Sequence, residues 1–301
     1  MKLILGFSIP LLFGNLFQQF YSMVDTMIVG RVLGTGPLAA VGSTGSITFL
    51  IIGFCLGLCS GFAIPVAQRF GSRDYKELRR FIGNAVWLCV GFGFVLTVLT
   101  VIFCRNILEL MGTPADIIDD AYAYLVVIFA GIPATFLYNM LAGIQRAIGD
   151  SRTPVVILVI ASIINIVLDI VLVVFIPMGV AGAAVATVAS QLIGGVVCLL
   201  YVSKHYEVLK MTREDFKINV PCIKRLLSMG LPMALQTSIT AIGSVILQAS
   251  VNSLGSTVVA SITAGSRLYM FFACAYDAMG VTMSTYLSLI HISEPTRPLY
   301  I

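Results

Sequence analysis

The chain has 301 residues, of which 58% are hydrophobic and only 11% carry a charge, and its mean hydropathy is +1.00. A soluble domain has roughly 25% charged residues, so most of this chain must face something other than water. The net charge of +4 does not indicate a nucleic-acid partner. The sequence shows no series of short alternating segments, as a transmembrane barrel would. The composition therefore predicts an all-α polytopic protein whose surroundings are the lipid bilayer.

Apolar runs long enough to cross a bilayer, about 20 residues each, recur along the whole chain. We expect eight membrane-spanning helices, with turn and charge signals between them. Their expected ranges are 3–29, 37–62, 81–104, 118–141, 154–176, 180–203, 229–252 and 258–288. The polar stretch 204–225 is expected to be a surface linker, with an amphipathic helix entered at Pro221 as an alternative.

Lysine and arginine are distributed unevenly among the expected loops. Fourteen of them fall at the N-terminus and in the stretches 68–80, 145–154 and 204–225, whereas the loops on the other side carry two. Because cytoplasmic loops carry an excess of these residues, we expect a cytoplasmic N-terminus. The first apolar segment is too long for a cleavable signal peptide and lacks a small-residue cleavage site, so we expect it to remain as a span.

An internal repeat relates the two ends of the chain. The segments "VLGTGPLAAVGSTGSI" (32–47) and "SLGSTVVASITAGSRL" (253–268) match at a constant offset, and Pro10 and Pro232 fall within one residue of the same register. The seventh span then repeats the first in parallel orientation. Six spans per unit is the plan of transporters built from two related halves, which need about twelve spans. We therefore expect an incomplete chain that holds about eight of twelve spans.

The repeat also suggests a division of the chain. We expect a complete six-helix lobe (1–203), a cytoplasmic linker (204–228) and the first two helices of a second lobe (229–288). The tail 289–301 has no apolar period and resembles translated sequencing-adapter read-through, so we expect it to be non-native.

Acidic residues inside the expected spans are few, and they indicate a functional site. A charged side chain at the bilayer centre costs about 2.5–3.5 kcal/mol on insertion scales. Asp25 and Asp169 each end a stripe of polar residues spaced three and four apart, which places each stripe on one helix face. Asp25 lies about 6 Å from the outer end of its helix, and Asp169 and Thr187 lie about 10 Å from theirs. We expect these residues to meet in a hydrated cavity; the alternative is that each joins helices by hydrogen bonds.

Five segments together resemble the multidrug and toxic compound extrusion (MATE) family. They are "PLLFGNLFQQFYSMVDTMIVGRVLG", "AQRFGSRD", "IQRAIGDSRTP", "NIVLDIVLV" and "GVAGAAVATVASQ". The resemblance runs from about residue 3 to 288. It implies a MATE-type two-lobe bundle that works as a secondary active antiporter, exporting organic cations in exchange for H+ or Na+. It further implies a multi-pass bacterial protein of the cell membrane, and not an enzyme. We expect a monomer, with no cofactor or metal besides the coupling ion.

The resemblance assigns roles to individual residues. It implies that the ion-coupling group is Asp25, Tyr21, Asn165, Asp169 and Thr187, and that Pro10 is a helix-one proline proposed to kink during the cycle. This set is typical of the DinF-like branch, because the seventh span lacks the acid that the NorM-like branch carries there. Asp277 is a candidate for a second-lobe cavity, and Arg267 is more typical of helix packing.

Three other functions were compared with the transporter. A lipid-linked oligosaccharide flippase of the same superfamily would have a strongly cationic cavity, for which only Arg267 is available in the spans. An intramembrane aspartyl protease would need a Gly-x-Gly-Asp helix as partner for "AYDAMG" (275–280), and the sequence has none. A non-transporting assembly subunit is the third alternative, against which the two aligned acids argue.

Overall fold

The computed structural model describes residues 2–254 and scattered positions beyond them: 258, 261–262, 265–266, 269–270, 272–273, 276 and 279–280. Of residues 2–11, Asn15 and Asn252, it describes the backbone alone. Every regular element in this part of the chain is helical, which confirms the expected all-α class. The expected eighth span and the tail 289–301 lie outside the continuous described region.

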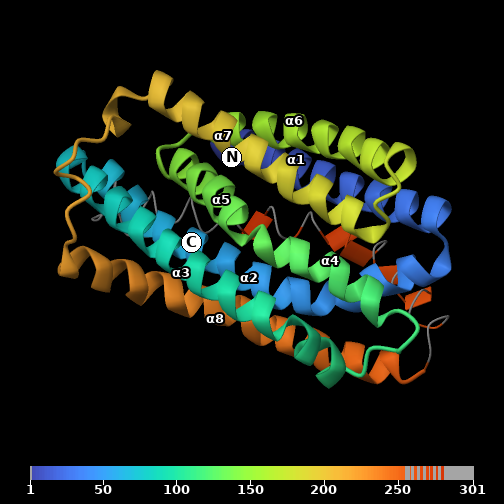
Figure 1. Ribbon diagram of the computed structural model, residues 1–301. Coiled ribbons are helices and arrows are strands. Elements are labelled where there is room, and N and C mark those ends of the chain that lie inside the picture. Colours follow the sequence, from blue (N-terminus) through green and yellow to red (C-terminus); the bar gives the residue numbers. More distant parts are fainter. Residues whose placement is uncertain are drawn as a thin grey trace, which may run out of the picture.

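The helices form an elongated bundle in which the chain passes back and forth along the long axis, with most connections at its two ends (Figure 1). The successive helices α4 and α5 together make one bent pass. In chain order the elements are α1 (Lys2–Ile28), η1 (Val29–Leu33), α2 (Thr35–Gly71), α3 (Tyr75–Leu110), α4 (Ile118–Ala130), α5 (Ile132–Ala147), α6 (Arg152–Asp169), η2 (Ile170–Phe175), α7 (Val180–His205), η3 (Glu207–Leu209) and α8 (Val220–Asn252). Here η1 and η2 are π-helical and η3 is a 3-10 turn.

The described helices have the length and composition of membrane spans. Five of them are long and apolar enough to cross a bilayer, or six if α4 and α5 form one bent span. Their outward faces carry large apolar side chains: Phe94, Ile102 and Phe175 are 68%, 64% and 74% exposed. Such exposed surface suits lipid rather than water. The prediction of a polytopic membrane protein is confirmed.

The expected span 118–141 is two helices, α4 and α5, bent by 47° at Gly131. Pro133 lies in the first turn of α5, where its missing N–H and its ring favour a break in the helix. A side chain at Gly131 would collide with Val188 of α7, so the bend brings the backbone against its neighbour. α5 then continues to Ala147, past the expected end of the span.

Several expected helix ends are placed differently in the structure. Of the stretch 68–80, expected as a loop, only residues 72–74 form a turn, because α2 continues to Gly71 and α3 begins at Tyr75. The Asp74 side chain caps α3 by accepting from Glu77 N at 3.2 Å. α8 begins at Val220 rather than at 229, with Asn219 Oδ1 accepting from Cys222 N at 3.2 Å. Hydropathy identifies the part of a helix that lies in lipid, so a polar extension into water escapes it.

α8 lies along α2 over most of its length (Figure 1). The two backbones approach most closely at Gly57 and Gly61 of α2, opposite Ala234 and Gly230 of α8. Small residues at such crossings allow the close packing that joins helices in lipid. This contact fixes the only continuously described helix of the expected second lobe against the first lobe.

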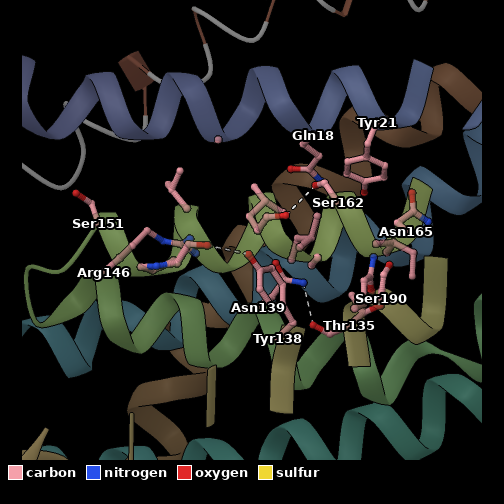
Figure 2. A pocket seen from close by; sticks show the side chains of 18 residues that line it. Gln18, Tyr21, Thr135, Tyr138, Asn139, Arg146, Ser151, Ser162, Asn165 and Ser190 are labelled. Atoms are coloured by element: carbon pink, nitrogen blue, oxygen red, sulfur yellow. Dashed lines mark hydrogen bonds between the residues drawn. The ribbon is translucent and has the colours of Figure 1, made fainter. Parts of the chain in front are cut away.

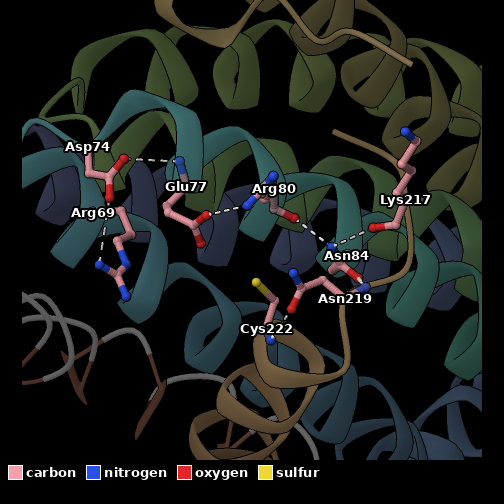
Figure 3. A network of polar contacts seen from close by, with 8 residues as sticks. All are labelled: Arg69, Asp74, Glu77, Arg80, Asn84, Lys217, Asn219 and Cys222. Atoms are coloured by element: carbon pink, nitrogen blue, oxygen red, sulfur yellow. Dashed lines mark hydrogen bonds and ion pairs between the residues drawn. The ribbon is translucent and has the colours of Figure 1, made fainter. Parts of the chain in front are cut away.

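The linker segment, residues 206–219, is held against α3 by the Asn84 side chain (Figure 3). Asn84 Nδ2 donates to the carbonyl oxygens of Arg80 at 2.8 Å and Lys217 at 3.3 Å, and its Oδ1 accepts from Asn219 N at 2.8 Å. Because Asn84 is fully buried, these bonds satisfy an amide that would otherwise be costly to place there. The linker segment is therefore held in a defined position against α3.

Candidate functional site

The two acids that sequence analysis singled out lie together inside the bundle. Asp25 on α1 is 9% exposed and Asp169 at the end of α6 is fully buried. α1 and α6 are in contact, and the two carboxyl groups are close enough for their charges to interact. Neither oxygen of Asp169 has a hydrogen-bond partner among the described residues. An ionised carboxylate in such a place needs a counter-charge or a proton.

Three further predicted residues surround this acid pair. Asn165 is one turn before Asp169 and 1% exposed, and its Nδ2 donates to Thr187 Oγ1 of α7 at 3.5 Å. Tyr21 is one turn before Asp25 and lies near Asn165 at the same end of a cavity (Figure 2). The structure thus brings together residues from three helices, and their role in ion coupling stays a prediction. They are Asp25, Tyr21, Asn165, Asp169 and Thr187.

Both acid-bearing helices change geometry just beyond the acids. η2 begins at the residue after Asp169, and η1 begins one turn after Asp25. π-helical turns interrupt the regular hydrogen-bond ladder and are frequent at functional sites. The two segments contribute to a buried apolar cluster at this end of the bundle, made of Val29, Val41, Val173, Val180 and Ala183. The acids therefore lie next to a buried apolar cluster rather than at an open surface.

A cavity of about 150 Å³ lies on the other side of the acids, among α1, α2, α5, α6 and α7 (Figure 2). Asn165 and Tyr21 line it, but Asp25 and Asp169 do not. Much of its lining is polar, including Gln18 and Ser162. A partly polar cavity is therefore present near the predicted site, but the two carboxyl groups do not line it as expected.

The sequence did not reveal the contribution of α5. Thr135, Asn139 and Arg146 line the cavity, and Thr135 Oγ1 donates to Gln191 Oε1 of α7 at 2.7 Å. These three residues are spaced by four and seven, which places them on one helix face and was the available signal. Arg146 was expected in the loop 145–154, which was wrong. α5 continues to Ala147 because the left-handed Gly149 (φ 91°) ends the helix only afterwards.

The remaining predicted residues lie at the limit of the description or outside it. Pro10 falls within α1, but its side chain is not described. Asp277 and Arg267 are outside the described residues, so their roles stay predictions. The six described cysteines are free and buried, and the described residues contain no group of three or more potential metal ligands.

Comparison with known proteins identifies the family. The MatE family model matches residues 10–171. The "Probable multidrug resistance protein YoeA" of Bacillus subtilis is 31% identical over 287 residues, covering 93% of this chain and 62% of that protein.

Solved structures agree with this match. One is a MOP superfamily transporter from Pyrococcus furiosus, whose binding pocket of reverse polarity suggests a different function; its TM-score is 0.88 at 25% identity. Another is the outward-facing conformation of a multidrug resistance MATE family transporter, with a TM-score of 0.87 at 25% identity. Each match covers 97% of this chain and 65% of the other. The chain spans less than two thirds of the length of each of these three proteins. By its sequence match and its helical arrangement, this chain belongs to the MatE family.

Proposed function

We propose that this chain forms the ion-coupling part of a secondary active antiporter that exports organic cations in exchange for H+ or Na+. The observation that carries the proposal is the buried pair Asp25 and Asp169, of which Asp169 has no hydrogen-bond partner among the described residues. Structural carboxylates inside proteins are hydrogen-bonded or paired with a cation. A buried acid such as Asp169, without such a partner among the described residues, suits a site where a proton and a cation replace one another.

The exchange follows from the chemistry of the pair. Ionising two neighbouring carboxyl groups that have little water around them has a high free-energy cost. A proton or a bound cation must therefore neutralise part of the charge. A proton and a cation then compete for one site. Asn165, bonded to Thr187, lies between the acids and the cavity, where its amide can hold a neutral carboxyl group in place.

The names of the relatives support efflux of drug-like molecules. YoeA of Bacillus subtilis is named a multidrug resistance protein, and one solved neighbour is a multidrug resistance MATE family transporter. We extend this substrate class to the present chain. Large organic cations bind through broad apolar walls and a carboxylate, and such walls accept many ligands.

We further propose that the protein lies in the plasma membrane of a bacterium with its N-terminus in the cytoplasm. The stretches 68–80, 145–154 and 204–225, which hold most of the lysines and arginines, all lie at one end of the bundle (Figure 1). The positive-inside rule places that end in the cytoplasm. A membrane-impermeant maleimide applied to whole cells should therefore label Asp116→Cys and not Ser72→Cys, both of which are exposed positions. Labelling at Ser72→Cys alone would reverse the orientation.

The test of coupling uses vesicles that carry the protein and are loaded with a fluorescent organic cation. A pH gradient and a Na+ gradient are applied separately, which identifies the ion. Asp25→Asn and Asp169→Asn should each abolish gradient-driven efflux, while Asp116→Asn, an exposed acid in the turn before α4, should leave it unchanged.

A second measurement does not require a complete transport cycle. Binding of tetraphenylphosphonium to the purified 301-residue chain should weaken as the pH falls, because protons compete for the acids. Asp169→Asn should remove this dependence. Cation binding that is independent of pH, together with efflux that survives both substitutions, would refute the proposed coupling site.

A further inference from the structure

Arg146 lines the cavity and has no counter-ion among the residues that the structure describes. It extends from the last turn of α5 into the cavity, at the end opposite Asn165 (Figure 2). No ion pair and no hydrogen bond joins its guanidinium group to any residue in the described part of the chain. Arg146 is partly buried and lines the cavity, so the N–H donors of its guanidinium group are available there to an anion or to water.

Asp150, a carboxylate in the loop after α5, already has hydrogen-bond partners. Asp150 Oδ1 accepts from the backbone N–H groups of Arg152 and Thr153, both at 3.0 Å, and its Oδ2 accepts from the hydroxyl group of Tyr206. No ion pair between Asp150 and Arg146 is formed. The Asp150 carboxylate therefore caps α6 and holds the linker segment. It does not neutralise Arg146, whose charge faces the cavity.

The surroundings of Arg146 suit an organic anion. The hydroxyl-bearing residues Ser151 and Tyr138 line the same cavity, and the Tyr138 hydroxyl already donates to Pro154 O at 3.3 Å. Val155 and Leu158 add apolar surface further along the cavity wall. A guanidinium group matches the planar, two-oxygen geometry of a carboxylate, with apolar surface beyond it for a short hydrocarbon body.

We propose that Arg146 binds the carboxylate group of a small organic anion in this cavity. The volume of about 150 Å³ limits the body of the ligand, since an apolar cavity of similar size accommodates benzene. This site differs in charge and position from the acid pair, and the inference does not depend on the proposed cation exchange.

The test measures binding of benzoate to the purified 301-residue chain by isothermal titration calorimetry in a chloride-free buffer. Benzamide is the matched neutral ligand, because it has the same ring and nearly the same shape. Benzoate should bind at least about tenfold more tightly than benzamide, the ratio expected for a charge-assisted hydrogen-bond pair. Arg146→Gln should remove this preference, and Arg146→Lys should retain part of it because the charge remains without the planar fork.

Arg152→Gln is the matched control, since Arg152 is an exposed arginine in the first turn of α6. It should bind benzoate as the unmodified chain does. The comparison of benzoate with benzamide needs no variant, so it decides the matter even if Arg146→Gln does not fold. Equal binding of the two ligands, no binding of benzoate, or unchanged benzoate binding in Arg146→Gln would overturn the proposal. Displacement of benzoate by an equal concentration of chloride would also overturn it, by showing a site for inorganic anions.

Discussion

Substituting Gly57 by alanine should separate α2 from α8 and destabilise the bundle. A Cβ atom at Gly57 would lie 2.6 Å from Ala234 Cα and 2.8 Å from Met233 O, both of which are backbone atoms of α8. Carbon atoms in contact lie about 3.5–4.0 Å apart, so the helices must move apart by about 1 Å. Neither obstacle is the end of a flexible side chain, so a rotamer change cannot relieve the contact.

The change in unfolding free energy caused by Gly57→Ala is the sum of two opposing effects. Overpacking a close contact costs about 1–3 kcal/mol, and the upper end applies here because the obstacle is backbone. Alanine in a helix interior recovers about 1 kcal/mol relative to glycine. The expected net loss is therefore about 2 kcal/mol of unfolding free energy. Gly91→Ala is the matched control, since Gly91 lies inside α3 with no atom within 4 Å of an added Cβ, and it should stabilise the protein by about 0.5–1 kcal/mol.

The assay is reversible unfolding of the purified chain in mixed micelles with increasing SDS, followed by far-UV circular dichroism. The two substitutions are chemically identical, so helix propensity and detergent binding affect both alike. Opposite signs are expected for Gly57→Ala and Gly91→Ala. Equal stabilisation by both would show that α2 and α8 are not packed through Gly57.

Two other substitutions test the contacts of the linker segment. Asn84→Ala removes three hydrogen bonds of a buried amide and should cost about 2–3 kcal/mol, so limited trypsin digestion should cleave the linker segment faster, while Asn106→Ala at an exposed site of α3 should not change the rate. Tyr206→Phe removes the hydrogen bond to Asp150 and should cost about 1 kcal/mol at pH 7, with Tyr122→Phe as the control. Burial alone would raise the pKa of Asp150, but hydrogen bonds from Thr153, Tyr206 and the backbone hold it below its ordinary value.

The sign of the pH dependence follows from that lowered pKa. A group whose pKa is lower in the folded state stabilises the fold above its unfolded value, about 3.9 for aspartate, and this contribution is lost as the pH falls through the folded value. The difference between Tyr206→Phe and the unmodified chain should therefore be constant from pH 5 to 8 and shrink below about pH 4. A difference that grows in acid would contradict the assigned hydrogen bond.

The sequence predicted the spans and the acid pair because both depend on simple periodic patterns. Apolar runs identify segments that lie in lipid, and the polar stripes ending at Asp25 and Asp169 followed the helical period. Both patterns are local, and the similar depths of the polar residues in the first, fifth and sixth expected spans indicated that they could meet. Residues from α1, α6 and α7 therefore met in the structure as expected.

The missed features depend on contacts that no local pattern encodes. Arg146 looks like a loop residue beside Gly149 and Asp150, and only the length of α5 places it in the cavity. The bend at Gly131 follows from Pro133, but the close approach of Val188 from α7 at that point is a tertiary contact that hydropathy does not reveal. The π-helical turns carry apolar sequences that could equally continue an α-helix, so hydropathy alone cannot reveal them.

The position of the acid pair constrains how an exchange mechanism can operate. An apolar cluster closes the side toward η1 and η2, whereas Asn165 and the polar cavity lie on the other side. An ion cannot cross packed valine side chains without losing its hydration, which costs far more than thermal energy. Access from the η1 and η2 end therefore requires Val29 and Val173 to separate. Each belongs to the π-helical turn that follows one of the acids, so a change of charge at the pair acts on the segments that close the path. In the proposed exchange, opening of this end would therefore be coupled to the acids through these two turns.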